Sequence, residues 1–139
     1  MKYKVISNGP KRSFSIVIGL KEGYDQTNAN LHTQFEIEQV YLNWVNEKLA
    51  NKQPYLPGMF HQDVMVYMHN DKQIKEPVVL FNGEVSNIFN AYLTDSAVEE
   101  ILKELGSLFG STTNQTRIYI SYTGYFGFNF SLVLEKEND

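Results

Sequence analysis

The side chains best suited to chemistry form one row near the C-terminal end of the sequence. Arg117 is one of two arginines, and it opens a segment, 117–135, in which polar and apolar residues alternate. Every second residue of a strand lies on the same face. The polar face would carry Arg117, Tyr119, Ser121, Thr123 and Tyr125. Arginine binds phosphate or carboxylate through paired hydrogen bonds and stacks on rings. We therefore expect these residues to bind a small anionic, nucleotide-like ligand; the alternative is an exposed arginine that only begins a strand.

A second group of residues could support acid–base catalysis. His61 and Asp63 would share one face of a strand, and Glu76 and Glu84 follow in the next apolar segment, but nothing in their spacing selects a pair. The sequence lacks a GxSxG nucleophile turn, a glycine-rich phosphate loop and an HExxH metal site. The main expectation is a non-enzymatic protein that sequesters its ligand without metal or cofactor. The alternative is a small intracellular enzyme that uses His61, Asp63 and Glu84.

Composition limits the class of protein. The chain has 139 residues, of which 42% are hydrophobic and 14% aromatic, which suits one α+β domain over residues 1–139. There is no cysteine for a disulfide, no apolar run of membrane-spanning length and no apolar leader, so we expect a cytoplasmic protein. The net charge is −4 and the basic residues are dispersed, which disfavours a nucleic acid polymer as partner.

Periodicity and turn residues predict the elements that position these side chains. Thr33 and Glu36 form a capping box at the start of a helix, and Thr94, Asp95 or Ser96 could begin a second helix that ends near Gly106 or Gly110. The predicted strands are Lys2–Ser7, Ser13–Leu20, about Phe60–Met68 and Pro77–Val85, with a turn at Asn8-Gly9 and a charged connection at His69–Glu76.

The segment Arg117–Glu135 organises the predicted sheet. Its apolar parity continues past Gly124 and Gly127, whereas a two-residue hairpin turn would reverse it. The pattern therefore favours one long strand bent at the two glycines, with Phe126, Phe128 and Phe130 packed in the core.

The order of elements predicts a ferredoxin-like β-α-β-β-α-β sandwich with an extra N-terminal strand and a long bent C-terminal strand. Two helices would cover one face of the sheet. The other face is left for a ligand or for a second copy, so we expect a homo-oligomer. A third possibility is a protein–protein inhibitor that docks through the exposed sheet face.

The layout also resembles a family of small phage counter-defence proteins, the Thoeris anti-defence sponges. The segments that carry the resemblance are SIVIGL at Ser15–Leu20, EPVVLFNGEV at Glu76–Val85 and TNQTRIYI at Thr113–Ile120. The resemblance implies a non-catalytic oligomer that sequesters a cyclic nucleotide immune signal at a subunit interface in the host cytoplasm.

Overall fold

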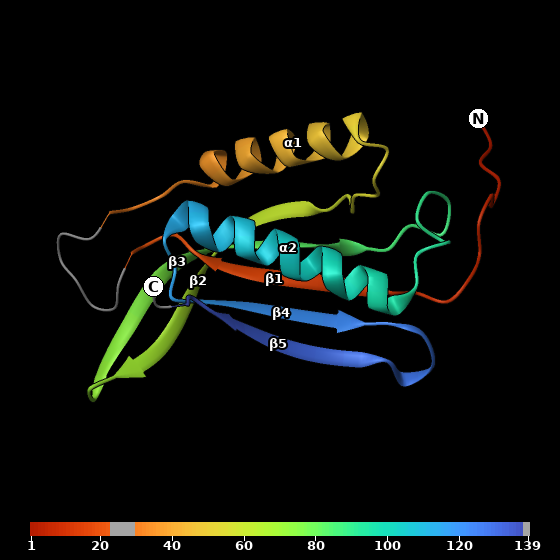
Figure 1. The fold of residues 1–139 in the computed structure, drawn as a ribbon. Helices are drawn as coiled ribbons and strands as arrows, with labels where there is room; N and C mark the ends of the chain where they lie inside the picture. The colour runs from red at the N-terminus through yellow and green to blue at the C-terminus, as the bar shows by residue number, and fades with distance from the viewer. Residues whose placement is uncertain (23–29, 138–139) are drawn as a thin grey trace.

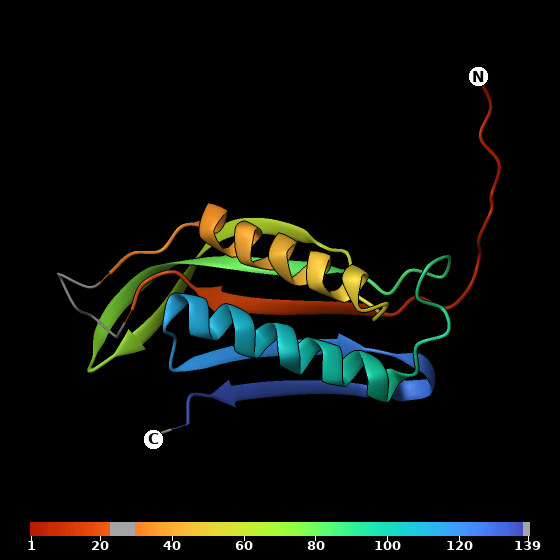
Figure 2. The same ribbon diagram turned by 45° about the horizontal axis from the view of Figure 1, so that its top comes forward.

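One antiparallel sheet carries two helices on the same face (Figures 1 and 2). The computed structural model describes residues 1–22 and 30–137. The elements are β1 (Ser13–Gly19), α1 (Gln34–Ala50), β2 (Met59–His69), β3 (Lys72–Glu84), α2 (Asp95–Thr113), β4 (Arg117–Thr123), a 3₁₀ turn (Tyr125–Gly127) and β5 (Asn129–Glu135). The strand order is β2-β3-β1-β4-β5. The α+β class and the ferredoxin-like arrangement are confirmed, with β5 added at one edge. Neither helix in the described ranges is both long and apolar enough to cross a membrane.

The core lies between the sheet and the helices. Phe14, Ile16 and Ile18 alternate inward along β1, and the inward residues of β4 alternate in the same way. Phe81 of β3 is the centre of an aromatic cluster, because its ring centroid lies 5.0 Å from that of Tyr41 and 4.9 Å from that of Phe60. Such pairs stabilise a core beyond the area that they bury. The surplus of aromatic residues therefore serves the core first.

The helix starts agree with the sequence. The Thr33 hydroxyl accepts a hydrogen bond from the Glu36 backbone N–H at 3.2 Å, and Thr94 does the same for Ala97 at 3.1 Å. The predicted end of the second helix is wrong, because α2 continues to Thr113 and ends at Asn114 in the left-handed conformation. Gly110 instead allows close packing: a Cβ there would lie 2.9 Å from Ile118 Cγ1.

The long bent C-terminal strand is wrong. The segment is a hairpin, in which β4 and β5 pair antiparallel around residues 124–128. A loop with an odd number of residues preserves parity, so Ile118 faces Leu134 and both point to the helix side. At the tip, Phe126 has a positive φ of 49° and is fully exposed, whereas a core position was predicted.

The extra N-terminal strand is also wrong. Residues 1–11 form no strand or turn and leave the body as an exposed arm (Figure 2). The arm joins the body of the molecule at Arg12, which is buried. Its guanidinium donates to the Leu93 carbonyl at 2.8 Å, lies 3.6 Å from Asp95 and stacks 4.3 Å from the centre of the Tyr125 ring. Burial and a hydrogen bond to Asp95 raise the pKa of Tyr122 in the same cluster.

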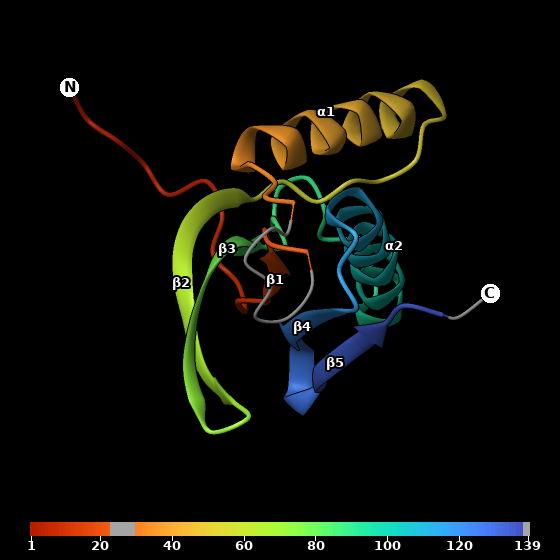
Figure 3. The same ribbon diagram turned by 90° about the vertical axis from the view of Figure 1, so that its left-hand side faces the viewer.

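The β2–β3 hairpin extends beyond the helices. The charged connection predicted at His69–Glu76 is mostly strand, and the turn is confined to Asn70 and Asp71, both with positive φ. On the helix side of this extension Val64 and Val66 are 56% and 53% exposed, so no helix covers them. Figure 3 shows the hairpin curving away from the helices, which makes the open face of the sheet concave.

Candidate functional site

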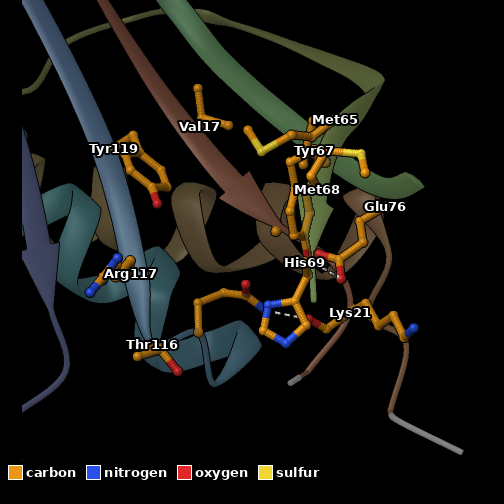
Figure 4. Close-up of a pocket in the computed structure, with 13 residues that line it drawn as sticks. Val17, Lys21, Met65, Tyr67, Met68, His69, Glu76, Thr116, Arg117 and Tyr119 are labelled. Atoms are coloured by element: carbon orange, nitrogen blue, oxygen red, sulfur yellow. Dashed lines mark hydrogen bonds between the residues drawn. The ribbon is translucent and has the colours of Figure 1, made fainter. Parts of the chain in front are cut away.

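The concave face holds a pocket of about 480 Å³, a size typical of small-molecule sites. One wall comes from the β2–β3 hairpin and the other from the start of β4, with β1 between them (Figure 4). The floor is apolar, since Val17 of β1 and Val78 of β3 line it. Residues far apart in the sequence therefore meet at one end of the open face.

The hairpin wall carries a fixed carboxylate. Glu76 faces Met65 across the β2–β3 ladder, and Tyr67 lies two residues further along the same face of β2. Such diagonal neighbours are within reach of a long side chain. The Tyr67 hydroxyl donates a hydrogen bond of 2.7 Å to Glu76 Oε1. Both side chains are half-buried, so the carboxylate is oriented while one edge of the pocket stays open to solvent.

The β4 wall carries a cation and an aromatic ring. Arg117 and Tyr119 both line the pocket, and Tyr119 is 41% exposed. Within the part of the chain that the structure describes, Arg117 forms no ion pair. Its guanidinium remains available to a ligand carboxylate or phosphate.

Gln115 closes the end of the pocket. Its Nε2 donates to the Lys21 carbonyl at 2.9 Å and so ties the entry of β4 to the exit of β1. Gly19 leaves room for this side chain, because a Cβ at position 19 would lie 2.2 Å from Gln115 Oε1 and Gln115 would have to shift. Lys21 itself lines the pocket.

His32 contacts two glutamates, Glu22 before it in the sequence and Glu36 after it. His32 Nε2 lies 2.7 Å from Glu22 and its Nδ1 lies 2.8 Å from Glu36. Both ring nitrogens must donate to satisfy two carboxylates, which requires the imidazolium form. Burial lowers the pKa of His32, but the hydrogen bonds to Glu36 and Glu22 outweigh it, and the pKa is raised. The hydrogen bond to His32 lowers the pKa of each of those glutamates.

The predicted binding row is divided by the structure. Arg117 and Tyr119 enter the pocket, as described above. Ser121 and Thr123 lie on the same face but line a separate hollow of about 360 Å³ near Glu84. Tyr125 is outside the row, because it lies in the 3₁₀ turn and stacks on Arg12.

The acid–base group named in the alternative is not brought together. His61 and Asp63 face Leu80 and Val78 across the ladder, and neither lines the pocket. Glu84 forms an exposed ion pair of 3.4 Å with Lys11 at the other end of the sheet. Nor do three His, Asp or Glu side chains in the described ranges converge in a way that could hold a metal ion.

The carboxylate in the pocket is Glu76, which sequence reasoning considered without being able to select it. Its partner Tyr67 lies nine positions earlier, and only the hairpin register joins the two. Taken together, the pocket offers the Glu76 carboxylate on one side, the cations Arg117 and Lys21, the His69 imidazole and tyrosine rings over an apolar floor. This arrangement complements a ligand with an aromatic part and charges of both signs.

Comparisons with known proteins identify solved structures with the same fold. No protein-family model matches the sequence, and no curated protein matches it significantly. A phage SAM lyase in complex with S-methyl-5'-thioadenosine has a TM-score of 0.67 and covers 96% of this chain and 97% of its own. A phage SAM lyase in the apo state has a TM-score of 0.70 and covers 99% of each chain. Both are 14% identical to this chain, so the likeness shows the fold.

These comparisons correct the expected function. The expectation of a non-enzymatic protein that sequesters its ligand is wrong, because the structures that share the fold from end to end are lyases, which are enzymes. The sponge type implied by the family resemblance is not supported either, although both similar proteins are from phage. The small-enzyme alternative is the better supported of the sequence-based hypotheses.

Proposed function

We propose that this chain is an enzyme that cleaves S-adenosylmethionine (SAM) in the pocket between the β2–β3 hairpin and β4. The observation that supports it most is the Glu76 carboxylate, held by Tyr67 on one pocket wall opposite Arg117 and Tyr119 on the other. The fold of a SAM lyase surrounds that pocket. A phage protein with this activity would act in the host cytoplasm as a counter-defence factor, because it would remove the methyl donor that the host uses.

The charges of SAM match the two walls. SAM carries a sulfonium, an ammonium and a carboxylate, together with a planar adenine. Arg117 would bind the carboxylate, Tyr119 would stack on the adenine, and Glu76 would face the cationic part. The apolar floor favours the reaction, because the cationic sulfonium becomes a neutral thioether. Water would stabilise the charged reactant more strongly than this floor does.

The bond that breaks joins the sulfonium to the γ-carbon of the amino acid part. Sulfur keeps the electron pair and leaves as S-methyl-5'-thioadenosine. The four-carbon fragment is completed in one of two ways: Glu76 takes a β-proton and an alkene forms, or the substrate carboxylate attacks the γ-carbon and a lactone forms. The two products are isomers of equal mass, so proton NMR of the four-carbon product, which separates vinyl protons from the ring methylene protons of a lactone, decides which role Glu76 has.

The first test is turnover by a matched pair of variants. Purified protein should convert SAM to S-methyl-5'-thioadenosine, followed by liquid chromatography. Glu76→Gln should lower kcat by about 100-fold or more, the range expected for a positioned acid–base or electrostatic group. The control is Glu84→Gln on the same strand and sheet face but outside the pocket, which should leave kcat unchanged. Turnover by Glu76→Gln at the parental rate, or none by the parent, would contradict the proposal.

A further inference from the structure

The exposed N-terminal arm has the pattern of a strand that lacks its sheet. Lys2, Tyr3, Lys4 and Val5 alternate basic and apolar side chains, and Tyr3 and Val5 are 91% and 82% exposed. A strand of this pattern would bury one face and keep the other in solvent. The described body of the same molecule offers the arm no ladder partner.

The sheet has a free edge of matching character at β5. This strand pairs with β4 on one side, so its other side carries unpaired backbone N–H and C=O groups. Leu132 and Leu134 point to the helix side and are half-buried, whereas Val133 is 54% exposed on the opposite face. The end of this edge is acidic on balance, because Glu135 and Glu137 flank a single lysine, Lys136.

A groove of about 490 Å³ runs between this edge and α2. The helix borders it with Gly106, Ser107, Gly110 and Ser111, so no large side chain of α2 enters the groove. A strand added to β5 would place its apolar face in this groove. Strand addition at a sheet edge takes its affinity from backbone hydrogen bonds and its specificity from alternate side chains.

We propose that the N-terminal arm of a second copy of this chain adds as a strand to the free edge of β5. Tyr3 and Val5 enter the groove beside Leu132 and Leu134, and the two lysines lie near the acidic end of the edge. The arm of the same copy is directed elsewhere: Figure 3 shows it leaving on the β2 side, and β5 is at the opposite edge of the sheet. Each copy gives one arm and accepts one, so a closed assembly pairs the β5 edge of every copy.

Because the chain has no cysteine, introduced thiols can test the contact directly. One full-length chain carries Lys4→Cys and the other Val133→Cys, because Lys4 lies on the face of the added strand opposite Tyr3 and Val5 and so on the same face as Val133. The two chains are co-expressed, purified together and treated with a short bis-maleimide. We expect a crosslinked heterodimer. The matched control is Val66→Cys, on the opposite edge strand with an exposed fraction of 53% against 54%. It should give several-fold less crosslink. Equal crosslinking at both edges, or none at Val133→Cys, would refute the proposal.

Exchanging the charges on the two chains provides a second test of this contact. Lys2→Glu in the chain that gives the arm, which already carries Lys4→Cys, should lower the yield of heterodimer. Glu135→Lys with Glu137→Lys in the accepting chain should restore it, because the charges are again opposite. A yield of crosslinked heterodimer that neither charge exchange alters would show that the arm does not lie at this edge. A crosslink that forms only within a chain carrying both cysteines would show that the arm belongs to its own sheet.

Discussion

At the scale of single residues, the pocket separates the carboxylate of Glu76 from the guanidinium of Arg117. Glu76 lies on the hairpin wall and Arg117 on the β4 wall, with an apolar floor between them. Two opposite charges that do not neutralise each other can each attract a different end of one ligand. This separation distinguishes the pocket from the ion pairs elsewhere in the described chain, such as the contact of 2.8 Å between Lys48 and Glu104 that joins the two helices.

Arg117 should affect binding more than turnover. Arg117→Ala should raise KM for SAM about tenfold, because one charge-assisted hydrogen bond to the substrate carboxylate is lost in ground and transition states alike. Arg117→Lys should recover part of the loss, since the charge returns without the paired donors. Steady-state kinetics of the three proteins measures both effects. An unchanged KM, or unfolding of the alanine variant, would exclude this role.

The contribution of His32 to stability should depend on pH. A raised pKa means that this contribution is complete below the ordinary value of 6.5 and is lost as pH rises through the raised value. The lowered pKa values of Glu22 and Glu36 act in the opposite sense, with full effect above 4.5 and loss as pH falls through the lowered values. The free-energy difference between parent and His32→Gln should therefore be larger at about pH 5.5 than at about pH 8.5 in urea melts. The same difference at both pH values would show that the imidazolium is not formed.

Among these residues, the sequence could predict only those that a strand pattern places. Arg117 and Tyr119 follow from alternation along one segment, and the structure does bring both to the pocket. Glu76 and Tyr67 could not be paired in advance, because their contact depends on where the β2–β3 turn falls. The predicted turn covered His69–Glu76, whereas the strands continue to Asn70 and Asp71 and thereby fix the register.

At the scale of elements, local signals were reliable at helix starts. Thr33→Ala should lower the free energy of unfolding by about 1 kcal/mol, because the Glu36 amide loses its partner at the start of α1. Thr112→Ala is the control, since its hydroxyl donates within α2 to a carbonyl that the helix already uses. Denaturant melts compare the two variants. Equal stability losses would mean that the cap is not responsible.

The C-terminal hairpin shows where a local signal misleads. The unbroken alternation of apolar residues favours one long strand over a two-residue turn. It excludes only loops with an even number of residues. The observed loop preserves parity and adds β5 to the sheet. A pattern of faces therefore predicts burial in β4 and most of β5 correctly and still leaves the direction of the chain undecided.

At the scale of the whole molecule, the order of helices and strands predicted the class of fold, because two helices and four of the strands admit few arrangements. The arm was assigned a strand from its alternation, but alternation does not show whether a partner strand exists in the same chain. The open sheet face was predicted as the functional face, and the pocket lies there. Neither the composition nor any motif of the sequence predicted the reaction that we propose for this pocket.

The hairpin that overhangs the helices also affects how this protein could change. Because Val64 and Val66 are exposed on its back, substitutions at the exposed positions of this wall leave the buried core intact. The opposite wall is β4, which packs against the core through Ile118 and Ile120. Both are almost fully buried, so substitutions in this strand are expected to destabilise the fold. A mutational library intended to redirect ligand preference should therefore be concentrated on the overhanging half, where new pocket shapes can be sampled at little risk to expression.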